Sequence, residues 1–335
     1  MPWQPHNKYC WDFWFAHQEQ TLHVFYLQAN RLDCAYNPER RHNLATIGHA
    51  ILTDFGWQEL QNQPVSRREG DYWDNISIWT GSIIKKGDRY YLFYTARSSS
   101  DPFILTTHER RQPQNIGVAE SSNLLTWERK IETPVIPNPG VDSGFDGVSW
   151  RDPYVIKSAT DDQFYAFICG CPKDAPTDAG GVVAYATSSN LKDWQTSSNQ
   201  ILYKSPEFRY LEVPQVFWRN MPQQNSWRLY LLFSPYWNRF FERRDSRGTY
   251  YIRSLPIKDP KQVSYDSIPW VDEPANLLID GFYGGKFVNP ETNKNPVFFG
   301  FQLEDEGGHF VGGISDPQWS TFAEDGTIHL SKSKP

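Results

Sequence analysis

Three acidic residues in this 335-residue sequence lie in short clusters that also contain Trp, Arg or Pro. Carboxylates that share one pocket have their pKa values pushed apart, so that one stays an anion while another holds a proton near neutral pH. Hydrolysis of a glycosidic bond needs this division between a nucleophile or base and an acid. The three candidate catalytic residues are Asp12, Asp152 and Glu212.

The three acids fall at matched places in the chain. Each lies just before a predicted buried strand, and two further polar residues precede similar strands, with steps of 68, 72, 60 and 68 residues between successive positions. If these strands line one axis, their polar residues converge on a central funnel. This arrangement favours a shared pocket over the alternative that each acid merely caps a separate turn. The five positions are Asp12, Thr80, Asp152, Glu212 and Asp280.

The strands themselves repeat five times. Alternating aromatic and aliphatic residues recur in segments whose central residues are 68, 74, 65 and 68 positions apart. Five copies of about 67 residues fill the chain, and internal repeats of this kind indicate a repeat architecture. The central residues are Val24, Leu92, Ala166, Leu231 and Phe299.

A second phrase, S-x-N-L-x-x-W, recurs in step with the strands and predicts a hairpin turn followed by a Trp that packs between repeats. It ends at Trp127 and again at Trp194. Clusters of Gly, Pro, Asn, Asp and Ser separate short strands, which is typical of an all-β fold.

Four strands per repeat, arranged radially, predict a single five-bladed β-propeller with antiparallel four-stranded blades. A two-sheet sandwich is the alternative fold, but it gives no reason for a fivefold count. We expect one catalytic domain over residues 1–335, with blades over about 10–75, 76–148, 149–208, 209–276 and 277–330.

Composition and charge argue against several other classes of protein. The net charge of −6 and the lack of a basic block argue against nucleic-acid binding. Apolar runs are too short to span a membrane, and the first residues do not form a signal peptide, so the sequence predicts a cytoplasmic protein without a membrane partner. The four cysteines, including the Cys169–Cys171 pair, suggest buried free thiols, and we expect no metal or other cofactor.

These clusters resemble the motifs of the β-fructosidase superfamily, which comprises invertases, levanases and inulinases (family 32) and levansucrases (family 68). The order and spacing agree over about residues 9 to 318. The similar segments are Trp11-Asp12-Phe13-Trp14 (W-D-S-W), Gly48-His49-Ala50 (G-H-A), Trp79-Thr80-Gly81-Ser82 (W-S-G-S), Arg151-Asp152-Pro153 (R-D-P) and Leu211-Glu212-Val213-Pro214 (E-C-P or E-R-P).

The resemblance implies a role for each acid. Asp12 would be the nucleophile, Glu212 the general acid/base and Asp152 the residue that holds sugar hydroxyls in the transition state. The mechanism would be retaining, with water or a second sugar as acceptor and with the nucleophile and acid carboxyls roughly 5–5.5 Å apart. The substrate would be a small saccharide such as sucrose, and the predicted sugar-binding residues are Trp11, Trp14, Trp79, Ser82, Arg151, Gln215, Asp280 and Tyr283.

This sequence also departs from the common fructosidase pattern. The N-D-P-N-G segment is absent, Val213 replaces the Cys of E-C-P, and the chain ends near the fifth blade, so we expect no C-terminal β-sandwich. An inverting propeller hydrolase of the arabinanase or xylosidase type is an alternative, with carboxyls about 6.5–9.5 Å apart. The Arg before Asp152 and the W-T-G-S segment argue against it. A sugar-binding propeller without catalytic activity is the third possibility.

Overall fold

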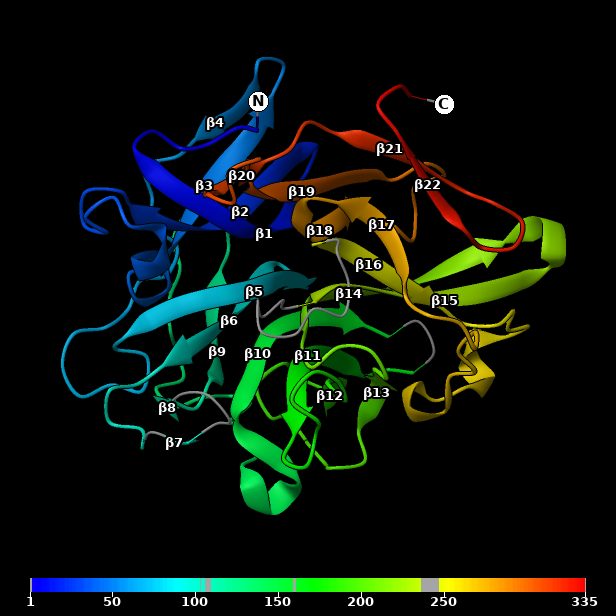
Figure 1. Ribbon diagram of the computed structural model, residues 1–335, viewed down its shortest axis with the longest axis horizontal. Helices are drawn as coiled ribbons and strands as arrows, with labels where there is room; N and C mark the ends of the chain where they lie inside the picture. Colours follow the sequence, from blue (N-terminus) through cyan, green and yellow to red (C-terminus); the bar gives the residue numbers. More distant parts are fainter. Residues whose placement is uncertain (1, 103, 106–109, 159–160, 236–246, 335) are drawn as a thin grey trace.

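The computed structural model is a ring of five antiparallel sheets around one axis, which confirms the predicted all-β propeller (Figure 1). It describes residues 2–102, 104–105, 110–158, 161–235 and 247–334. Within each sheet the paired strands are antiparallel and follow one another mainly in chain order. Every sheet of the ring begins with its innermost strand, so five inner strands surround the axis (Figure 1).

The first three blades are built as follows. Blade 1 contains β1 (Lys8–Gln18), β2 (Thr21–Asn30), β3 (Thr46–Thr53) and β4 (Gly56–Glu59). Blade 2 contains β5 (Ser77–Lys86), β6 (Arg89–Arg97) and β9 (Asn115–Ser121), and its outermost segment is reduced to the bridges Ile116–Ile136 and Glu120–Glu128. A small hairpin of β7 (Ile104–Leu105) and β8 (Arg110–Arg111) extends from this blade. Blade 3 contains β10 (Phe145–Lys157), β11 (Phe164–Pro172), β12 (Val182–Ser188) and β13 (Ile201–Lys204).

The remaining two blades complete the ring. Blade 4 contains β14 (Leu211–Met221), β15 (Ser226–Pro235), β16 (Gly248–Arg253) and β17 (Asn276–Asp280). Blade 5 contains β18 (Phe282–Val288), β19 (Val297–Glu304), β20 (Phe310–Ile314), β21 (Gln318–Phe322) and β22 (Ile328–Ser331), with β20 and β21 both paired to β19. Five short 3₁₀ turns lie in the connections of the described residues: Pro38–Asn43, Val141–Ser143, Pro222–Gln224, Pro260–Gln262 and Tyr265–Ser267.

The ring is closed by residues from the two ends of the chain. Trp3 and Ile314 exchange two backbone hydrogen bonds of 2.8 Å each. The segment before β1 therefore extends the sheet of blade 5 at β20, beside which the N-terminus lies in Figure 1. This bridge pairs part of the edge of β20 with the segment that precedes blade 1.

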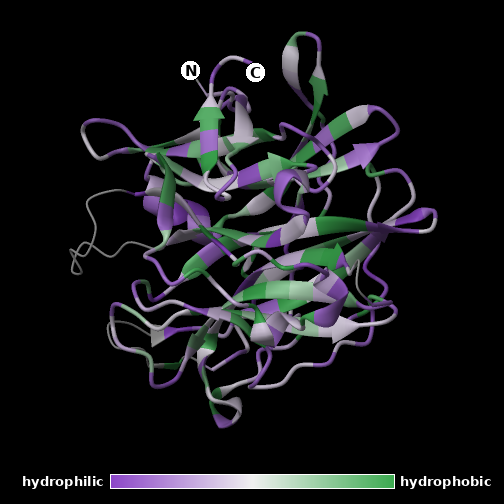
Figure 2. Cartoon of the chain, turned by 90° about the vertical axis from the view of Figure 1, so that its right-hand side faces the viewer, coloured by the Kyte–Doolittle hydropathy of each residue, from purple (hydrophilic) through white to green (hydrophobic). Residues whose placement is uncertain are grey.

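Hydrophobic residues concentrate on the strands, while the connecting loops are mainly hydrophilic (Figure 2). Buried hydrophobic side chains pack between neighbouring sheets. All five central residues of the repeated strand are buried, as the repeat predicts. The four cysteines are buried and unpaired, in agreement with the prediction of free thiols. No helix within the described ranges has the length and apolarity needed to cross a membrane.

The Trp residues of the S-x-N-L-x-x-W phrase pack between blades, as predicted. Trp127 of blade 2 meets Phe25 of blade 1 edge-on, with ring centroids 5.8 Å apart. One repeat later, Trp194 of blade 3 meets Phe93 of blade 2 in the same way at 5.4 Å. The repeated phrase therefore forms the contacts that hold adjacent blades in register.

Replacing Phe93 by Ala should destabilise the protein by about 3–5 kcal/mol, because Phe93 is fully buried and the change leaves a cavity facing Trp194. Phe55, at the tip of the β3–β4 hairpin, is 102% exposed and provides the matched control. Phe55→Ala should change stability by no more than about 0.5 kcal/mol. Urea unfolding of the two variants checks both values, and equal midpoints would contradict the role given to Phe93.

Candidate active site

A β-bulge interrupts each of the five inner strands at a similar height. The register shifts between Trp11 and Phe13, Trp79 and Gly81, Arg151 and Tyr154, Glu212 and Gln215, and Tyr283 and Lys286. A bulge leaves one or more residues unpaired and re-aims the neighbouring side chains. Asp12, Thr80 and Asp152 are among these unpaired residues, which explains how side chains from different blades meet at the axis.

Backbone strain accompanies two of these bulges. Asp152 has a φ of 60° and Val213, next to Glu212, has a φ of 51°. A residue other than Gly in the left-handed region costs roughly 1–3 kcal/mol and is held there by its surroundings. Such strain concentrates at functional sites, and here it occurs beside two of the three candidate carboxylates.

Asp12 lies on β1 and accepts a hydrogen bond at Oδ2 from the Thr80 hydroxyl of β5. Burial, together with the nearby carboxylates Asp152 and Glu212, raises the pKa of Asp12 to about 7, against the hydrogen bond from Thr80 and the positive charge of Lys286. The carboxyl group of Asp12 is therefore poised to change its charge near neutral pH.

Asp152 connects blades 2, 3 and 4. Its Oδ2 accepts from the backbone N–H of Val213 at 3.0 Å, and its own N–H donates to the Thr95 hydroxyl at 2.9 Å. The Thr95 hydroxyl donates in turn to the carbonyl oxygen of Thr80 at 3.0 Å. Burial raises the pKa of Asp152 to about 6, although the Arg151 guanidinium opposes the shift.

Glu212 is held from both sides by donors on neighbouring blades. Arg151 Nη2 donates to Oε1 at 2.7 Å, and the Tyr283 hydroxyl donates to Oε2 at 2.6 Å. Arg151 is itself fixed by Gln114, whose Oε1 accepts from Nη1 at 3.1 Å. Burial, together with the Glu212 carboxylate, raises the pKa of the Tyr283 phenol well above its usual range, so Tyr283 stays a proton donor to Glu212.

The structure thus brings together five of the residues singled out from the sequence: Asp12, Asp152, Glu212, Arg151 and Tyr283. Coulomb interactions couple all three carboxylates, and Arg151 approaches both Glu212 and Asp152. A cluster with one cation, one phenol and three acids can hold a sugar by its hydroxyls and also move a proton.

Two predicted sugar-binding tryptophans flank this cluster. Trp79 precedes Thr80 on β5, donates its ring N–H to the carbonyl oxygen of His42 at 2.7 Å, and lies under the Arg97 guanidinium. Trp11 precedes Asp12 on β1 and meets the His42 ring edge-on at 6.1 Å. Both rings are thereby fixed next to the residues that carry the site, and their contact with sugar stays a prediction.

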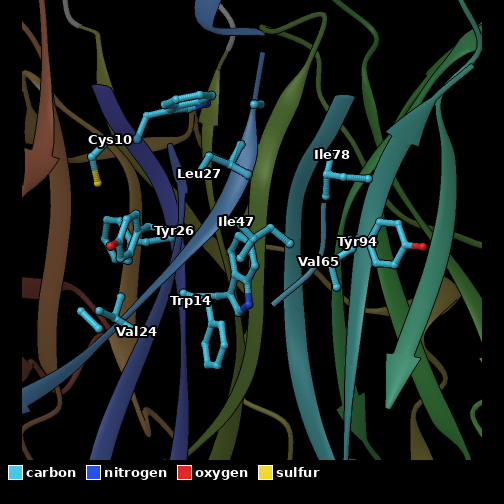
Figure 3. Close-up of a cluster of buried hydrophobic side chains, with 14 of the residues drawn as sticks. Cys10, Trp14, Val24, Tyr26, Leu27, Ile47, Val65, Ile78 and Tyr94 are labelled. Carbon is cyan, nitrogen blue, oxygen red and sulfur yellow. The ribbon is translucent and has the colours of Figure 1, made fainter. Parts of the chain in front are cut away.

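Trp14 was predicted to bind sugar, and its side chain is buried. It is 2% exposed and stacks against Phe25 of β2 with ring centroids 6.5 Å apart. Figure 3 shows it within a hydrophobic cluster that includes Val24, Ile47 and Val65. The side chain of Trp14 therefore packs the core of the blade, and its contact with sugar stays a prediction.

Ser82 and Gln215 connect neighbouring inner strands. The Ser82 hydroxyl accepts from the backbone N–H of Val155 at 3.0 Å and so links β5 to β10. Gln215 exchanges two hydrogen bonds with the backbone of Phe287, of 2.9 and 2.8 Å, and so links β14 to β18. Both side chains are buried and already paired, which gives them a role in fixing the ring around the site.

The prediction that Asp280 occupies the fifth inner position is wrong. Asp280 is exposed and ends β17, the outermost strand of blade 4, where it pairs with Gly248. The unpaired residues of the fifth inner strand are Gly284 and Gly285. A Cβ on Gly284 would lie 3.4 Å from Asp12 Oδ1, and its φ of 60° also favours Gly. Blade 5 thus contributes space beside Asp12 and no acid at this position.

Thr80, which the repeat placed at the second inner position, contacts Asp12 as expected. Sequence reasoning missed two other polar side chains at the site. Thr95 contacts Asp152, and Lys286 lies buried on β18. Thr95 and Lys286 carry no motif, and only the packing of the blades brings them to the axis. Within the described part of the chain, no group of three His, Cys, Asp or Glu side chains could hold a metal ion.

Comparison with known proteins identifies the class of this site. Residues 15–306 match the glycosyl hydrolases family 32 N-terminal domain, and the chain therefore belongs to that family. The matched region contains Asp152 and Glu212 and begins three residues after Asp12.

Individual relatives agree with this family. A bifunctional 6(G)-fructosyltransferase/2,1-fructan:2,1-fructan 1-fructosyltransferase from Allium cepa is 29% identical over 178 residues, which are 51% of this chain and 25% of that protein. The solved structures include a fructan 1-exohydrolase IIa variant from Cichorium intybus in complex with 1-kestose, with a TM-score of 0.70 at 15% identity over 98% of this chain and 59% of that one. A β-fructofuranosidase from Bombyx mori has a TM-score of 0.65 at 16% identity, over 97% of this chain and 64% of that one.

The chain thus spans about a quarter of the length of the onion relative and less than two thirds of these structures. At these identities, the two structures show a shared fold.

Proposed function

We propose that the protein is a retaining glycoside hydrolase that acts on β-fructosides such as sucrose or short fructo-oligosaccharides. The observation that carries the proposal is the convergence of Asp12, Asp152 and Glu212 from three blades, with Thr80 on Asp12 and with Arg151 and Tyr283 on Glu212. Family membership and the sugars named for the related proteins support the same class of substrate.

In the first step, a carboxylate oxygen of Asp12 attacks the anomeric carbon of the fructosyl unit. Glu212 gives its proton to the leaving oxygen as the glycosidic bond breaks, so a fructosyl ester of Asp12 and a neutral alcohol are formed. In the second step, Glu212 takes a proton from water, or from a sugar hydroxyl, which attacks the anomeric carbon and releases Asp12 as a carboxylate. The charge on the enzyme is the same before and after the two steps.

The groups around the acids suit this sequence. The Thr80 hydroxyl fixes one oxygen of Asp12 and leaves the other available for attack. The Asp152 carboxylate, fixed by Val213, can accept hydrogen bonds from sugar hydroxyls that strengthen as positive charge develops on the ring. Arg151 and Tyr283 hold Glu212 in one orientation, so that its proton is delivered along one direction.

The activity should depend on pH through Asp12. Its pKa is raised to about 7, and only the ionised form can attack, so kcat/KM should fall as the pH decreases through about 7. The raised folded-state pKa also means that the ionised carboxyl opposes folding, and this cost disappears on protonation. A pH profile of sucrose cleavage checks the first expectation. The acidic limb of this profile is the range in which kcat/KM falls as the pH decreases. A limb at about pH 4, the ordinary pKa of an aspartate, would contradict the expectation.

A panel of saccharides tests the proposed substrate class. Sucrose, inulin-type and levan-type oligomers, and aryl arabinosides and xylosides should be incubated with the protein, and all released sugars should be identified. We expect free fructose or fructosyl transfer products from at least one fructoside, and none after Asp12→Ala. Release of arabinose or xylose alone would contradict the proposal. Binding of sugars without any turnover would instead identify a sugar-binding propeller.

A further inference from the structure

Lys286 is a buried lysine on the innermost strand of blade 5. Its side chain is 3% exposed and follows the bulge that contains Gly284 and Gly285. Lysine is rarely buried to this extent, because removing the ammonium group from water is costly unless the protein supplies other partners. Sequence motifs assign no role to Lys286, and the proposed reaction does not use it.

The partners of this amine are backbone oxygens of the neighbouring blade. Nζ donates to the carbonyl oxygen of Val213 at 2.9 Å and to that of Pro214 at 2.8 Å. It also lies 5.2 Å from the centroid of the Tyr154 ring. Among the described residues, no carboxylate lies within 4.0 Å of Nζ, so its charge is not neutralised by a direct ion pair.

These two carbonyls belong to the bulge that directly follows Glu212. Val213 has its strained φ of 51° there, and its N–H donates to Asp152 Oδ2. Lys286 therefore holds the Val213–Pro214 segment of β14. The same segment orients Asp152 through the N–H of Val213, and Glu212 directly precedes it. A side chain that fixes this bulge also fixes the relative position of two of the three acids.

The charge of Lys286 acts on the acids as well. The charged groups that face it are Asp12 on β1 and Asp152 on β10, with Tyr154 as its neutral neighbour from β10. Its positive charge lowers the pKa of both carboxyls. Burial lowers the pKa of Lys286 itself to about 7, while Asp152 and Asp12 favour its charged form. Below about pH 7 the amine is therefore a cation in a region with little water, where a charge acts strongly.

We propose that Lys286 is a positioning residue that holds the Val213–Pro214 bulge under Glu212 and whose positive charge favours the ionised forms of Asp12 and Asp152. The inference rests on the proposed function, since it assigns Lys286 to the same site. It differs from a purely structural role in one respect. A structural lysine could be replaced by any side chain that keeps the fold, whereas this one also supplies a positive charge that lowers the pKa of both carboxyls.

Two variants remove the charge, one with and one without a donor for the carbonyls, and a third is the control. Lys286→Gln removes the charge and keeps an N–H donor for the carbonyls, Lys286→Met removes both, and Lys157→Gln is the control. Lys157 lies at the far end of the inner strand β10, where its side chain is 40% exposed. Circular dichroism and the thermal midpoint should show that the variants are folded before their pH profiles are compared.

Both variants at position 286 should move the acidic limb of kcat/KM upward by about one pH unit, which is about a tenfold loss at pH values below the limb. Lys157→Gln should leave the limb unchanged. A ¹³C NMR titration of protein labelled at the aspartate carboxyls gives a second readout, in which the Asp12 and Asp152 resonances should titrate at higher pH in Lys286→Gln.

The outcomes distinguish this inference from the proposed function. An unchanged limb and unchanged aspartate titrations in Lys286→Gln would overturn the inference while leaving fructoside hydrolysis intact. Failure of Lys286→Gln to fold would also overturn it, because the amine would then be required for the fold itself. If the wild-type protein releases no fructose, the proposed function fails, but the NMR titration still tests the effect of Lys286 on the carboxyls.

Discussion

Replacing Asp12 by Asn should lower kcat/KM for sucrose by about 10⁴-fold or more while leaving the propeller folded. The amide cannot form the fructosyl ester, so the first bond-making step is lost. An Asn oxygen can still accept the hydrogen bond of Thr80, which is why the packing should survive. Fructose release under steady-state conditions measures the loss, and the thermal midpoint measures the fold.

Asp142→Asn provides the control for this experiment, because Asp142 is an exposed acid in the short turn Val141–Ser143. It should retain wild-type activity. If Asp12→Asn kept more than about a tenth of the wild-type activity, Asp12 could not be the nucleophile, because losing a nucleophile has a far larger effect.

The second large effect is expected at Glu212. Glu212→Gln should lower the rate of sucrose cleavage by about 10²–10⁴-fold, since a glutamine keeps one oxygen acceptor for Arg151 or Tyr283 but cannot protonate the leaving oxygen. The loss should be much smaller for a substrate with a good leaving group, which departs without a proton. Comparing sucrose with β-fructofuranosyl fluoride measures this difference.

Glu212→Ala adds an independent criterion. Without the base, the second step should be slow with water and should be accelerated by azide, a nucleophile that needs no deprotonation. Formation of a fructosyl azide would show that Glu212 acts in both steps. Equal losses for both leaving groups, with no effect of azide, would instead give Glu212 a role in substrate binding alone.

Much of this architecture could be predicted from the sequence, because each repeat buries the same positions. The spacing of Val24, Leu92, Ala166, Leu231 and Phe299 reflects strands that pack identically in five blades. The same regularity located Asp12, Asp152 and Glu212 on inner strands. It did so because all three occur near bulges that recur at one height of the ring.

The burial of Trp14 and the outer position of Asp280 have physical causes of their own. Trp14 is two residues after Asp12, and simple alternation would place both side chains on one face of the strand. The bulge at Asp12 breaks that alternation, so Trp14 packs against Phe25. Asp280 has the spacing of the repeat, but it ends an outer strand immediately before the turn into β18. Spacing alone does not reveal on which side of that turn a residue lies.

Lys286 could not have been predicted from its type, since a lone lysine after two glycines is expected in solvent. Its burial depends on carbonyls that only the bulge in β14 turns toward it. Partners of this kind come from a strand about 70 residues away, and they exist only once blades 4 and 5 lie side by side.

The most direct test of the account is to trap the fructosyl–enzyme ester. Glu212→Ala should be mixed with β-fructofuranosyl fluoride, quenched in acid, digested, and analysed by mass spectrometry. The account predicts that the peptide containing Asp12 gains the mass of one fructosyl unit and that fragmentation places it on the Asp12 carboxyl. An adduct on Asp152 or another residue, or steady release of fructose with no adduct on any peptide, would contradict it.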